Sequence, residues 1–173
     1  MKVLAFAATS SKSSINKQLA NYTAKQINNA QVELLDINDY EMPLFNEDRE
    51  KELGQPALAK AFYKKLGEAD VIVISFAEHN GSYTAAYKNL FDWTSRIDQK
   101  LFQNKPVIML STSPGPGGAA SVLASAQASA PFFAAEVKGA ISIPSFYDNF
   151  DLENGQLTNQ DLVDKIMNVI AKL

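Results

Sequence analysis

Three polar turns contain the residues of this sequence whose types and spacing could do chemistry. Each turn follows an apolar run typical of a buried parallel strand. The first run, residues 3–7, leads into the turn at 9–16; the second, 71–74, leads into the turn at 77–82; and the third, 107–110, leads into the turn at 113–118. In an open α/β sheet, ligands bind beyond the carboxyl ends of the strands. The three turns therefore predict one shared ligand pocket.

The first turn is rich in groups that bind an anion. Its side chains include the hydroxyls of Thr9, Ser11, Ser13 and Ser14, the amide of Asn16 and the positive charge of Lys12. The backbone N–H groups and the dipole at the start of a helix are a suitable site for phosphate. Ser13 or Ser14 could instead only cap the helix that follows. A single cap does not account for so many hydroxyls, so we favour a phosphate site.

Two common nucleotide motifs do not explain these turns. The first turn lacks a Gly-Lys-Ser or Gly-Lys-Thr ending and also lacks G-x-G-x-x-G, which argues against a P-loop and against a dinucleotide turn. Residues 115–120 formally match G-x-G-x-x-A, but no acidic residue ends the next predicted strand. We interpret these glycines as allowing close backbone approach to a flat ring, with a plain flexible loop as the alternative.

The second turn contains the only histidine of the chain, His79. Asn80 and Gly81 permit positive φ and a chain reversal, so backbone groups of this turn could line a planar heterocycle. No Ser or Asp accompanies His79 at the spacing of a catalytic triad, and Glu78 has no second carboxylate in the motif. We therefore expect no catalytic acid or base among the side chains.

The overall composition narrows the class of protein. With 173 residues, of which 46% are hydrophobic and 20% charged, the chain is expected to form one domain over residues 1–173. The net charge of −3 predicts no nucleic-acid surface, and the absence of cysteine excludes disulfides and cysteine-based metal sites, so we expect no metal. No apolar run approaches the roughly 20 residues of a membrane span. We expect a cytoplasmic protein that does not enter the membrane.

Alternating apolar runs and amphipathic stretches predict repeated βαβ units. Strands are predicted over residues 2–7, 32–36, 71–76, 106–111 and 137–143, and helices over 14–27, 56–66, 84–97, 119–132 and 158–170, the last capped by Thr158. Residues 37–55 are expected to be irregular. Five parallel strands with right-handed crossovers favour a three-layer, doubly wound, flavodoxin-like α/β sheet of order 2-1-3-4-5. This order makes the ends of strands one, three and four neighbours.

The predicted helix over residues 84–97 has two apolar stripes. One stripe contains Tyr83, Tyr87 and Phe91, and the other contains Ala86, Leu90 and Trp93. One of them must face the sheet. The other is either a homodimer surface beside the ligand pocket or part of a wide core within one chain.

Several segments, in order along nearly the whole chain, match the motifs of one enzyme family. They read A-T-S-S-K-S-S-I-N at residues 8–16, M-P-L-F-N at 42–46, A-E-H-N-G-S at 77–82, K-N-L-F-D-W at 88–93 and S-P-G with G-G at 113–118. In these motifs the chain resembles the NAD(P)H-dependent FMN reductases, which include quinone, azo-dye and chromate reductases. It departs from the family pattern at Ala8, Ser11 and His79, where the family has Gly, often Arg, and Tyr.

The resemblance implies a set of cofactor-binding residues. The FMN phosphate would be held by Thr9, Ser11, Ser14 and Asn16 of the first turn, and Ile15 of the same turn would also bind the cofactor. The isoalloxazine ring and ribityl chain would lie against Ala77, Glu78, His79, Asn80 and Gly81. Ser113 and Gly115 would close the far side of the ring, and Phe45, His79 and Tyr83 would form the rim where substrates approach.

The resemblance also implies the reaction. Hydride would pass from NADPH or NADH to FMN, and electrons would then pass to a small acceptor such as a quinone, an azo compound, a metal oxyanion or free flavin. The cofactor would carry the redox chemistry, and the protein is expected to be a homodimer or a dimer of dimers. One alternative is a flavodoxin-like electron carrier, which the modest net charge disfavours. The other is an α/β binding module without a cofactor.

Overall fold

The computed structural model describes residues 1–173 and is built around a five-stranded parallel sheet. Its strands are β1 (Lys2–Ala8), β2 (Gln31–Leu35), β3 (Val71–Phe76), β6 (Pro106–Thr112) and β7 (Glu136–Ile143). Their spatial order is β2-β1-β3-β6-β7, which confirms the predicted flavodoxin-like order. β1 lies between β2 and β3, so that Val3 pairs with Val32 on one side and with Val71 on the other.

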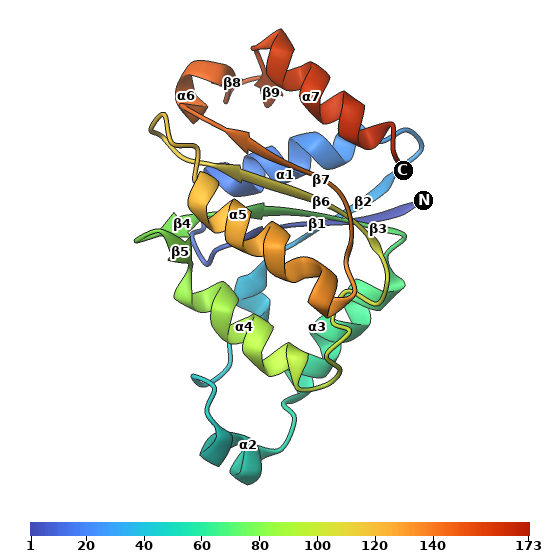
Figure 1. Ribbon diagram of the computed structural model, residues 1–173, viewed down its shortest axis with the longest axis vertical. Helices are drawn as coiled ribbons and strands as arrows, with labels where there is room; N and C mark the ends of the chain where they lie inside the picture. The colour runs from blue at the N-terminus through green and yellow to red at the C-terminus, as the bar shows by residue number, and fades with distance from the viewer.

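Helices cover both faces of the sheet (Figure 1). One face packs against α1 (Ile15–Lys25) and α7 (Gln160–Ile170), and the other against α3 (Ala57–Glu68), α4 (Ala85–Ser95) and α5 (Ala120–Ser129). Successive strand residues point to opposite faces, so Val3 and Val73 join the core under α1 and α7, whereas Leu4 and Ile72 join the core under α3–α5. No helix combines the length and the apolar character needed to cross a membrane.

The structure adds short elements between these units. They are the 3-10 helices at Ile37–Tyr40 and Ala130–Phe133, the helices α2 (Glu47–Leu53) and α6 (Phe146–Asn149), and two hairpins, β4 (Glu78–His79) with β5 (Ser82–Tyr83) and β8 (Phe150–Asp151) with β9 (Gln156–Leu157). The prediction of an irregular segment over residues 37–55 was wrong for α2. No residue of α2 is buried, so the helix has no periodic apolar face that a pattern could reveal.

The cap of the last helix also differs from the prediction. Asn159, not Thr158, is the N-cap of α7, because the Asn159 side-chain oxygen accepts the backbone N–H of Leu162 at 3.4 Å. The two residues are adjacent and both are good caps, so the sequence alone does not separate them.

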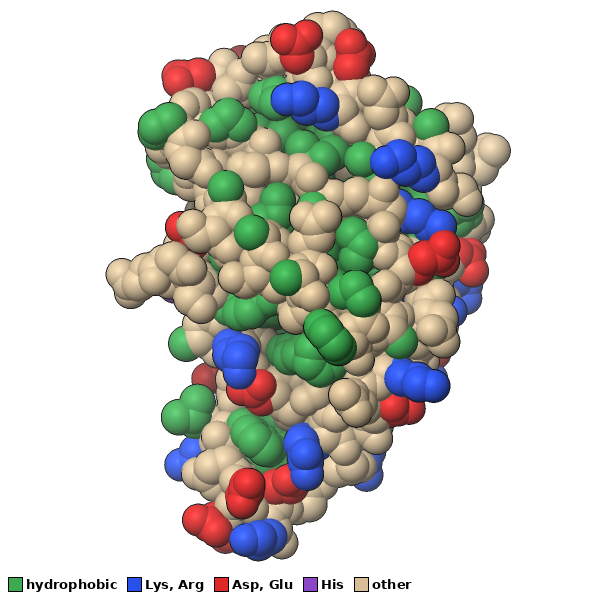
Figure 2. Space-filling view, in the orientation of Figure 1, with side chains coloured by type: hydrophobic (Ala, Val, Ile, Leu, Met, Phe, Trp, Pro, Cys, Tyr) green, Lys and Arg blue, Asp and Glu red, His purple; other side chains and the backbone are tan.

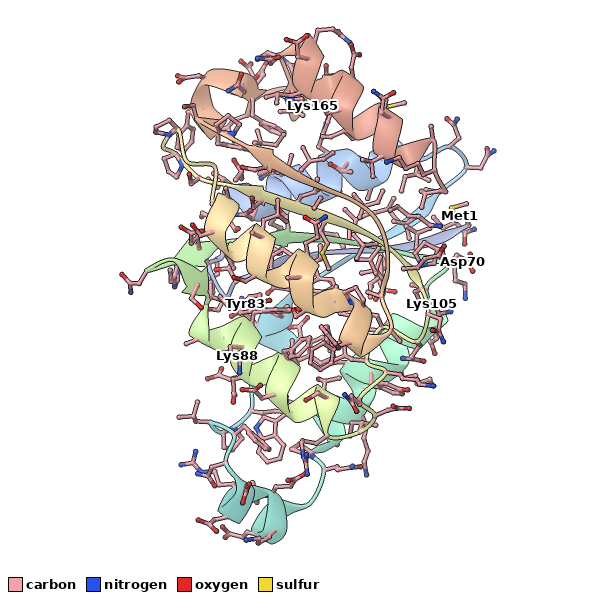
Figure 3. The ribbon with its side chains drawn as sticks, in the orientation of Figure 1. Met1, Asp70, Tyr83, Lys88, Lys105 and Lys165 are labelled. Atoms are coloured by element: carbon pink, nitrogen blue, oxygen red, sulfur yellow. The ribbon has the colours of Figure 1, made fainter.

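Both apolar stripes of α4 are covered by the chain itself. Leu90 and Trp93 are buried, and the Phe91 ring lies 4.6 Å from that of Phe133. Tyr83 lies between α4 and α5 (Figure 3), where its ring is 5.6 Å from that of Tyr87. Both stripes therefore make contacts within the chain, as the wide-core alternative predicts, while Tyr83, Ala86 and Phe91 stay half-buried.

Candidate cofactor-binding site

The three turns identified in the sequence lie together at one edge of the sheet. β1, β3 and β6 are adjacent and parallel, so the turns that follow Ala8, Phe76 and Thr112 are neighbours. The hairpin of β4 and β5 projects from this carboxyl edge (Figure 1). Met1 and Asp70 lie at the opposite, amino edge (Figure 3). The fold thus brings the predicted ligand residues to one place.

Hydroxyls of the first turn already make hydrogen bonds within the protein. Ser14 is the N-cap of α1, and its Oγ accepts the backbone N–H of Lys17 at 3.2 Å. The Thr9 Oγ1 accepts the backbone N–H of Ser11 at 3.2 Å and donates to the Ser11 Oγ at 3.3 Å. Thr9 and Ser14 are buried, whereas Ser11, Lys12 and Ser13 are exposed. Thr9 and Ser14 therefore shape the turn, and the other three face solvent.

The backbone of the first turn presents a row of free donors. The N–H groups of Ser13, Ser14, Ile15 and Asn16 have no acceptor within the protein. They stand at the start of α1, where the helix dipole is positive, and the first turn of α1 contains no acidic residue. A phosphate group fits this donor set.

The side chain of Asn16 faces the sheet and not the solvent. Its Oδ1 accepts the Ser75 hydroxyl at 2.7 Å and the Thr112 backbone N–H at 3.1 Å, and its Nδ2 donates to the Thr112 carbonyl at 3.1 Å. The residue is only 2% exposed. Asn16 thus joins α1 to β3 and β6, and the group it leaves free for a ligand is its backbone N–H.

An ion pair holds the first turn against the end of β2. The Lys17 Nζ lies 2.7 Å from the Asp36 Oδ2, and the Asn38 side chain donates to the Ser10 carbonyl at 3.1 Å. The hydrogen bond from Lys17, with a second from the Asn38 backbone, lowers the pKa of Asp36 below its ordinary value. Asp36 is therefore ionised at neutral pH. Its negative charge lies near the anion site, and the positive charge of Lys17 balances it.

The second turn is the tip of the short β4–β5 hairpin. Asn80 and Gly81 have φ values of 53° and 74°, which suit a two-residue hairpin turn. His79, Asn80 and Gly81 are exposed, and Ala77 is half-buried where the hairpin leaves the sheet. The backbone of this turn is thus open to a ligand beside the first turn.

Glu78 contacts the helix that follows the third turn. Its Oε2 accepts the backbone N–H of Val122, in the first turn of α5, at 2.9 Å. The residue at the N-cap of α5, Ala119, has φ 58° and offers no side-chain hydrogen bond. The Glu78 carboxylate therefore supplies a cap that α5 lacks locally.

The third turn is held by the segment that follows β7, which no motif of the sequence marks as part of the site. The carbonyls of Ser113 and Gly115 accept the backbone N–H groups of Phe146 and Ser145 at 3.0 and 2.9 Å. The Ser113 hydroxyl also donates to the Gly115 carbonyl at 3.2 Å. The signal that could have revealed this contact is the predicted strand order, which places the last strand beside the one that leads into the third turn.

The surroundings of Gly118 leave no space for a side chain. Its φ is 57°, and a Cβ at this position would overlap the Ser142 Oγ and the backbone of Ile143. The Gly118 carbonyl accepts the hydroxyls of Ser111 at 2.7 Å and Ser142 at 2.9 Å. The end of the third turn is thereby fixed against β6 and β7.

A cavity of about 420 Å³ opens beside the first turn. Ser10 lines it together with the segment after β2 and the start of α4, at Ile37, Asn38, Tyr40, Glu41, Met42, Leu44, Ala85, Ala86, Asn89 and Leu90. No motif of the sequence predicted a pocket at this position. Cavities of similar volume at the amino ends of β1 and β2 and beside the β8–β9 hairpin contact none of the three turns.

One wall of this cavity is held by two residues of α4. Asn89 accepts the Phe45 backbone N–H at 2.8 Å and donates to the Met42 carbonyl at 3.0 Å, and the Trp93 indole donates to the Pro43 carbonyl at 2.7 Å. The Phe45 ring packs edge-on against Trp93 at 5.0 Å. The segments 42–46 and 88–93, both of which carry the family resemblance, thus form one structural unit.

Phe45 and Tyr83 are packed within the chain, and of the three predicted rim residues only His79 is exposed.

Comparison with known proteins identifies similar sequences. A family model described as NADPH-dependent FMN reductase matches residues 1–148. An uncharacterized protein of Mycoplasma pneumoniae is 30% identical over 88% of this chain and 92% of its own length. The NADPH:quinone oxidoreductase of Arabidopsis thaliana is 34% identical over 65% of this chain, and the match spans 56% of that enzyme. The quinone reductase of Escherichia coli is 35% identical over 46% of this chain and 43% of its own length.

Solved structures share the fold. The flavoenzyme NAD(P)H:acceptor oxidoreductase FerB of Paracoccus denitrificans superposes with a TM-score of 0.80 at 22% identity, over 98% of this chain and 93% of that one. An FMN-dependent NADH-azoreductase of Bacillus anthracis, solved in complex with FMN, superposes with a TM-score of 0.65 at 14% identity, over 99% of each chain. At these identities the likeness concerns the fold.

Proposed function

Because the chain belongs to the NADPH-dependent FMN reductase family, we propose that it binds FMN across the three turns and reduces it with NADPH or NADH. The observation that carries the proposal is the row of free N–H groups at residues 13–16. These donors stand at the positive end of α1, beside exposed hydroxyls and Lys12 and without an acidic residue in that turn. A doubly charged phosphate is the ligand that this arrangement suits.

Each turn has a distinct part in the proposed site. The backbone of Ser13–Asn16, with the hydroxyls of Ser11 and Ser13, binds the phosphate. Thr9, Ser14 and the Asn16 side chain hold that backbone in place. The backbone of residues 77–81 and the turn from Ser113 to Gly115 line the ribityl chain and the ring.

The bound cofactor supplies the hydride and electron chemistry of the reaction. The protein positions it and needs no acid or base of its own. Glu78 is hydrogen-bonded to α5, and His79 is exposed at the hairpin without a carboxylate partner. We propose a small organic acceptor of the quinone class, since relatives of the chain carry that activity in their names.

A titration with FMN tests the proposal. The purified protein should bind FMN and quench its fluorescence, and anaerobic NADPH or NADH should then bleach the bound flavin. Bleaching distinguishes a reductase from an electron carrier, which would bind FMN without reacting. A protein that takes up no FMN would contradict the proposal and favour the cofactor-free binding module.

A charge at the first turn tests the phosphate site. Ser13→Glu should weaken FMN binding by about tenfold or more, because a negative charge replaces a donor beside the phosphate. Binding of riboflavin, which lacks the phosphate, should change little. Asn28→Glu, just beyond the opposite end of α1, carries the same charge and is the control. Equal affinity of both variants for FMN would place the phosphate elsewhere.

We also propose that the protein is a homodimer that associates through α5. Residues 119–133 contain no charged residue, although the side chains of Ala120, Ala124 and Ala128 are exposed and Phe132 is 75% exposed. Figure 2 shows the surface over α5 without charged side chains, which lie around it. Interfaces are depleted of charge at their centre in the same way.

A further inference from the structure

The start of α5 depends on a side chain from a distant segment. Ala119, at the N-cap, is in the left-handed region with φ 58° and makes no side-chain hydrogen bond, and the first turn of α5 contains no acidic residue. Glu78, 44 residues earlier in the chain, accepts the Val122 N–H at 2.9 Å. A carboxylate at this position satisfies a free donor and interacts favourably with the helix dipole.

The hairpin that carries Glu78 is too short to be held by its own pairing. It has only two residue pairs, Glu78 with Tyr83 and His79 with Ser82, and an isolated hairpin is marginal even when longer. Its far end is anchored where the Thr84 hydroxyl donates to the Ala8 carbonyl at 2.9 Å. Its near strand is anchored to α5 through Glu78.

The other partner of this contact is firmly placed. α5 continues directly from the third turn, and the Gly118 carbonyl is bonded to Ser111 and Ser142. The hydrogen bond from Val122 to Glu78 therefore joins a short hairpin with an exposed tip to an element that is held by several contacts. It sets the distance between the second and the third turn.

We propose that Glu78 is a positioning residue that fixes the second turn relative to the third and thereby controls the affinity of the site for the flavin ring, as distinct from the phosphate. This inference rests on the proposed function, in which those two turns line the ring. The carboxylate acts as a hydrogen-bond acceptor for α5 and does not touch the reacting atoms.

Two substitutions and two flavins separate this role from a general loss of binding. Glu78→Ala removes the acceptor and should weaken the binding of FMN and of riboflavin by the same factor, about tenfold. Glu78→Gln keeps an acceptor of the same shape and should retain binding within about threefold. Glu52→Ala, at an exposed position of α2, is the control. A loss of FMN affinity with unchanged riboflavin affinity would overturn the proposal.

Amide hydrogen exchange tests the contact without any flavin. In the protein alone, Glu78→Ala should speed exchange at Val122 at least tenfold relative to the wild type, while Glu78→Gln should stay near the wild type and the amides of β3 should remain protected in both. Unchanged exchange at Val122 in Glu78→Ala would overturn the positioning role. Failure of the wild type to bind FMN would instead contradict the proposed function, so the two failures are distinguishable.

Discussion

At the scale of single residues, the polar side chains of the site divide into those that are buried and those that are exposed. Thr9, Ser14 and Asn16 are buried, and each is hydrogen-bonded within the protein. Ser11, Lys12 and Ser13 are exposed. A buried polar group that lacks a partner costs free energy. Burial therefore commits a side chain to the fold, and a phosphate is left to the backbone donors and the exposed hydroxyls.

Asn16 gives the sharpest test of this division. Asn16→Ala should lower the free energy of unfolding by about 2–3 kcal/mol, because it leaves the Ser75 hydroxyl and the Thr112 backbone buried without their partner. Urea unfolding of the protein without flavin measures the change. Asn21→Ala, at a half-buried position of the same helix, should have a much smaller effect. Equal stability of the Asn16 variant and the wild type would show that the contact has no structural role.

At the scale of elements, helix starts and close contacts decide how the layers meet. Ser14, Thr84 and Asn159 each cap their own helix, whereas α5 takes its cap from the hairpin. On the other face of the sheet, Gly139 of β7 lies directly under α7, where a Cβ would overlap the Val169 side chain. The absence of a side chain at Gly139 thus sets how closely α7 approaches the sheet.

Gly139→Ala should lower the free energy of unfolding by about 1–3 kcal/mol, because the added methyl group pushes α7 away from β7. A double-mutant cycle with Val169→Ala isolates this contact. In the Val169→Ala background there is space for the methyl group, so the same substitution should cost less than half as much. An equal cost in both backgrounds would mean that the destabilisation arises elsewhere, for example from the strand backbone.

At the scale of the whole molecule, charge is distributed unevenly over the surface. Residues 119–133, which form α5 and the 3-10 helix after it, carry no charged side chain, whereas Lys88 of α4, labelled in Figure 3, forms an exposed ion pair with Asp92 at 2.7 Å. An uncharged helix face of small residues with an exposed phenylalanine at its end is suited to a second copy of the same face. This face replaces the α4 stripes as the basis for the proposed homodimer.

The dimer is tested by a charge on that face. Ala124→Glu should shift the molar mass measured by light scattering from that of two chains towards that of one, because a dimer with two-fold symmetry would bring two carboxylates to the interface. Ala61→Glu, at an exposed position of α3, should leave the mass unchanged. A wild-type protein with the mass of one chain would contradict the dimer, and an Ala124→Glu dimer would place its interface elsewhere.

Much of this architecture could be predicted from local sequence patterns. The apolar runs at β1, β3, β6 and β7 and the amphipathic stretches between them predicted the sheet, its order and the position of the three turns, all of which the structure confirms. These features depend on residues close in the chain, through side-chain periodicity and turn conformation. The motifs within the turns likewise sufficed to indicate the FMN reductase family.

Only the tertiary structure decided which side chains of the site are bonded within the protein and which are free for a ligand. Asn16 bonds to Thr112, 96 residues away, and Glu78 bonds to Val122, 44 residues away, so no local pattern reveals that their side chains are already engaged. The same holds for α4, whose aromatic stripe is covered by Phe133 of a later segment. The sequence determined which residues gather at the carboxyl edge, because strand order follows from local pattern and chain connectivity. The packing of distant segments decided which of them remain free for a ligand, because a buried polar group is bonded to whatever the fold brings within reach.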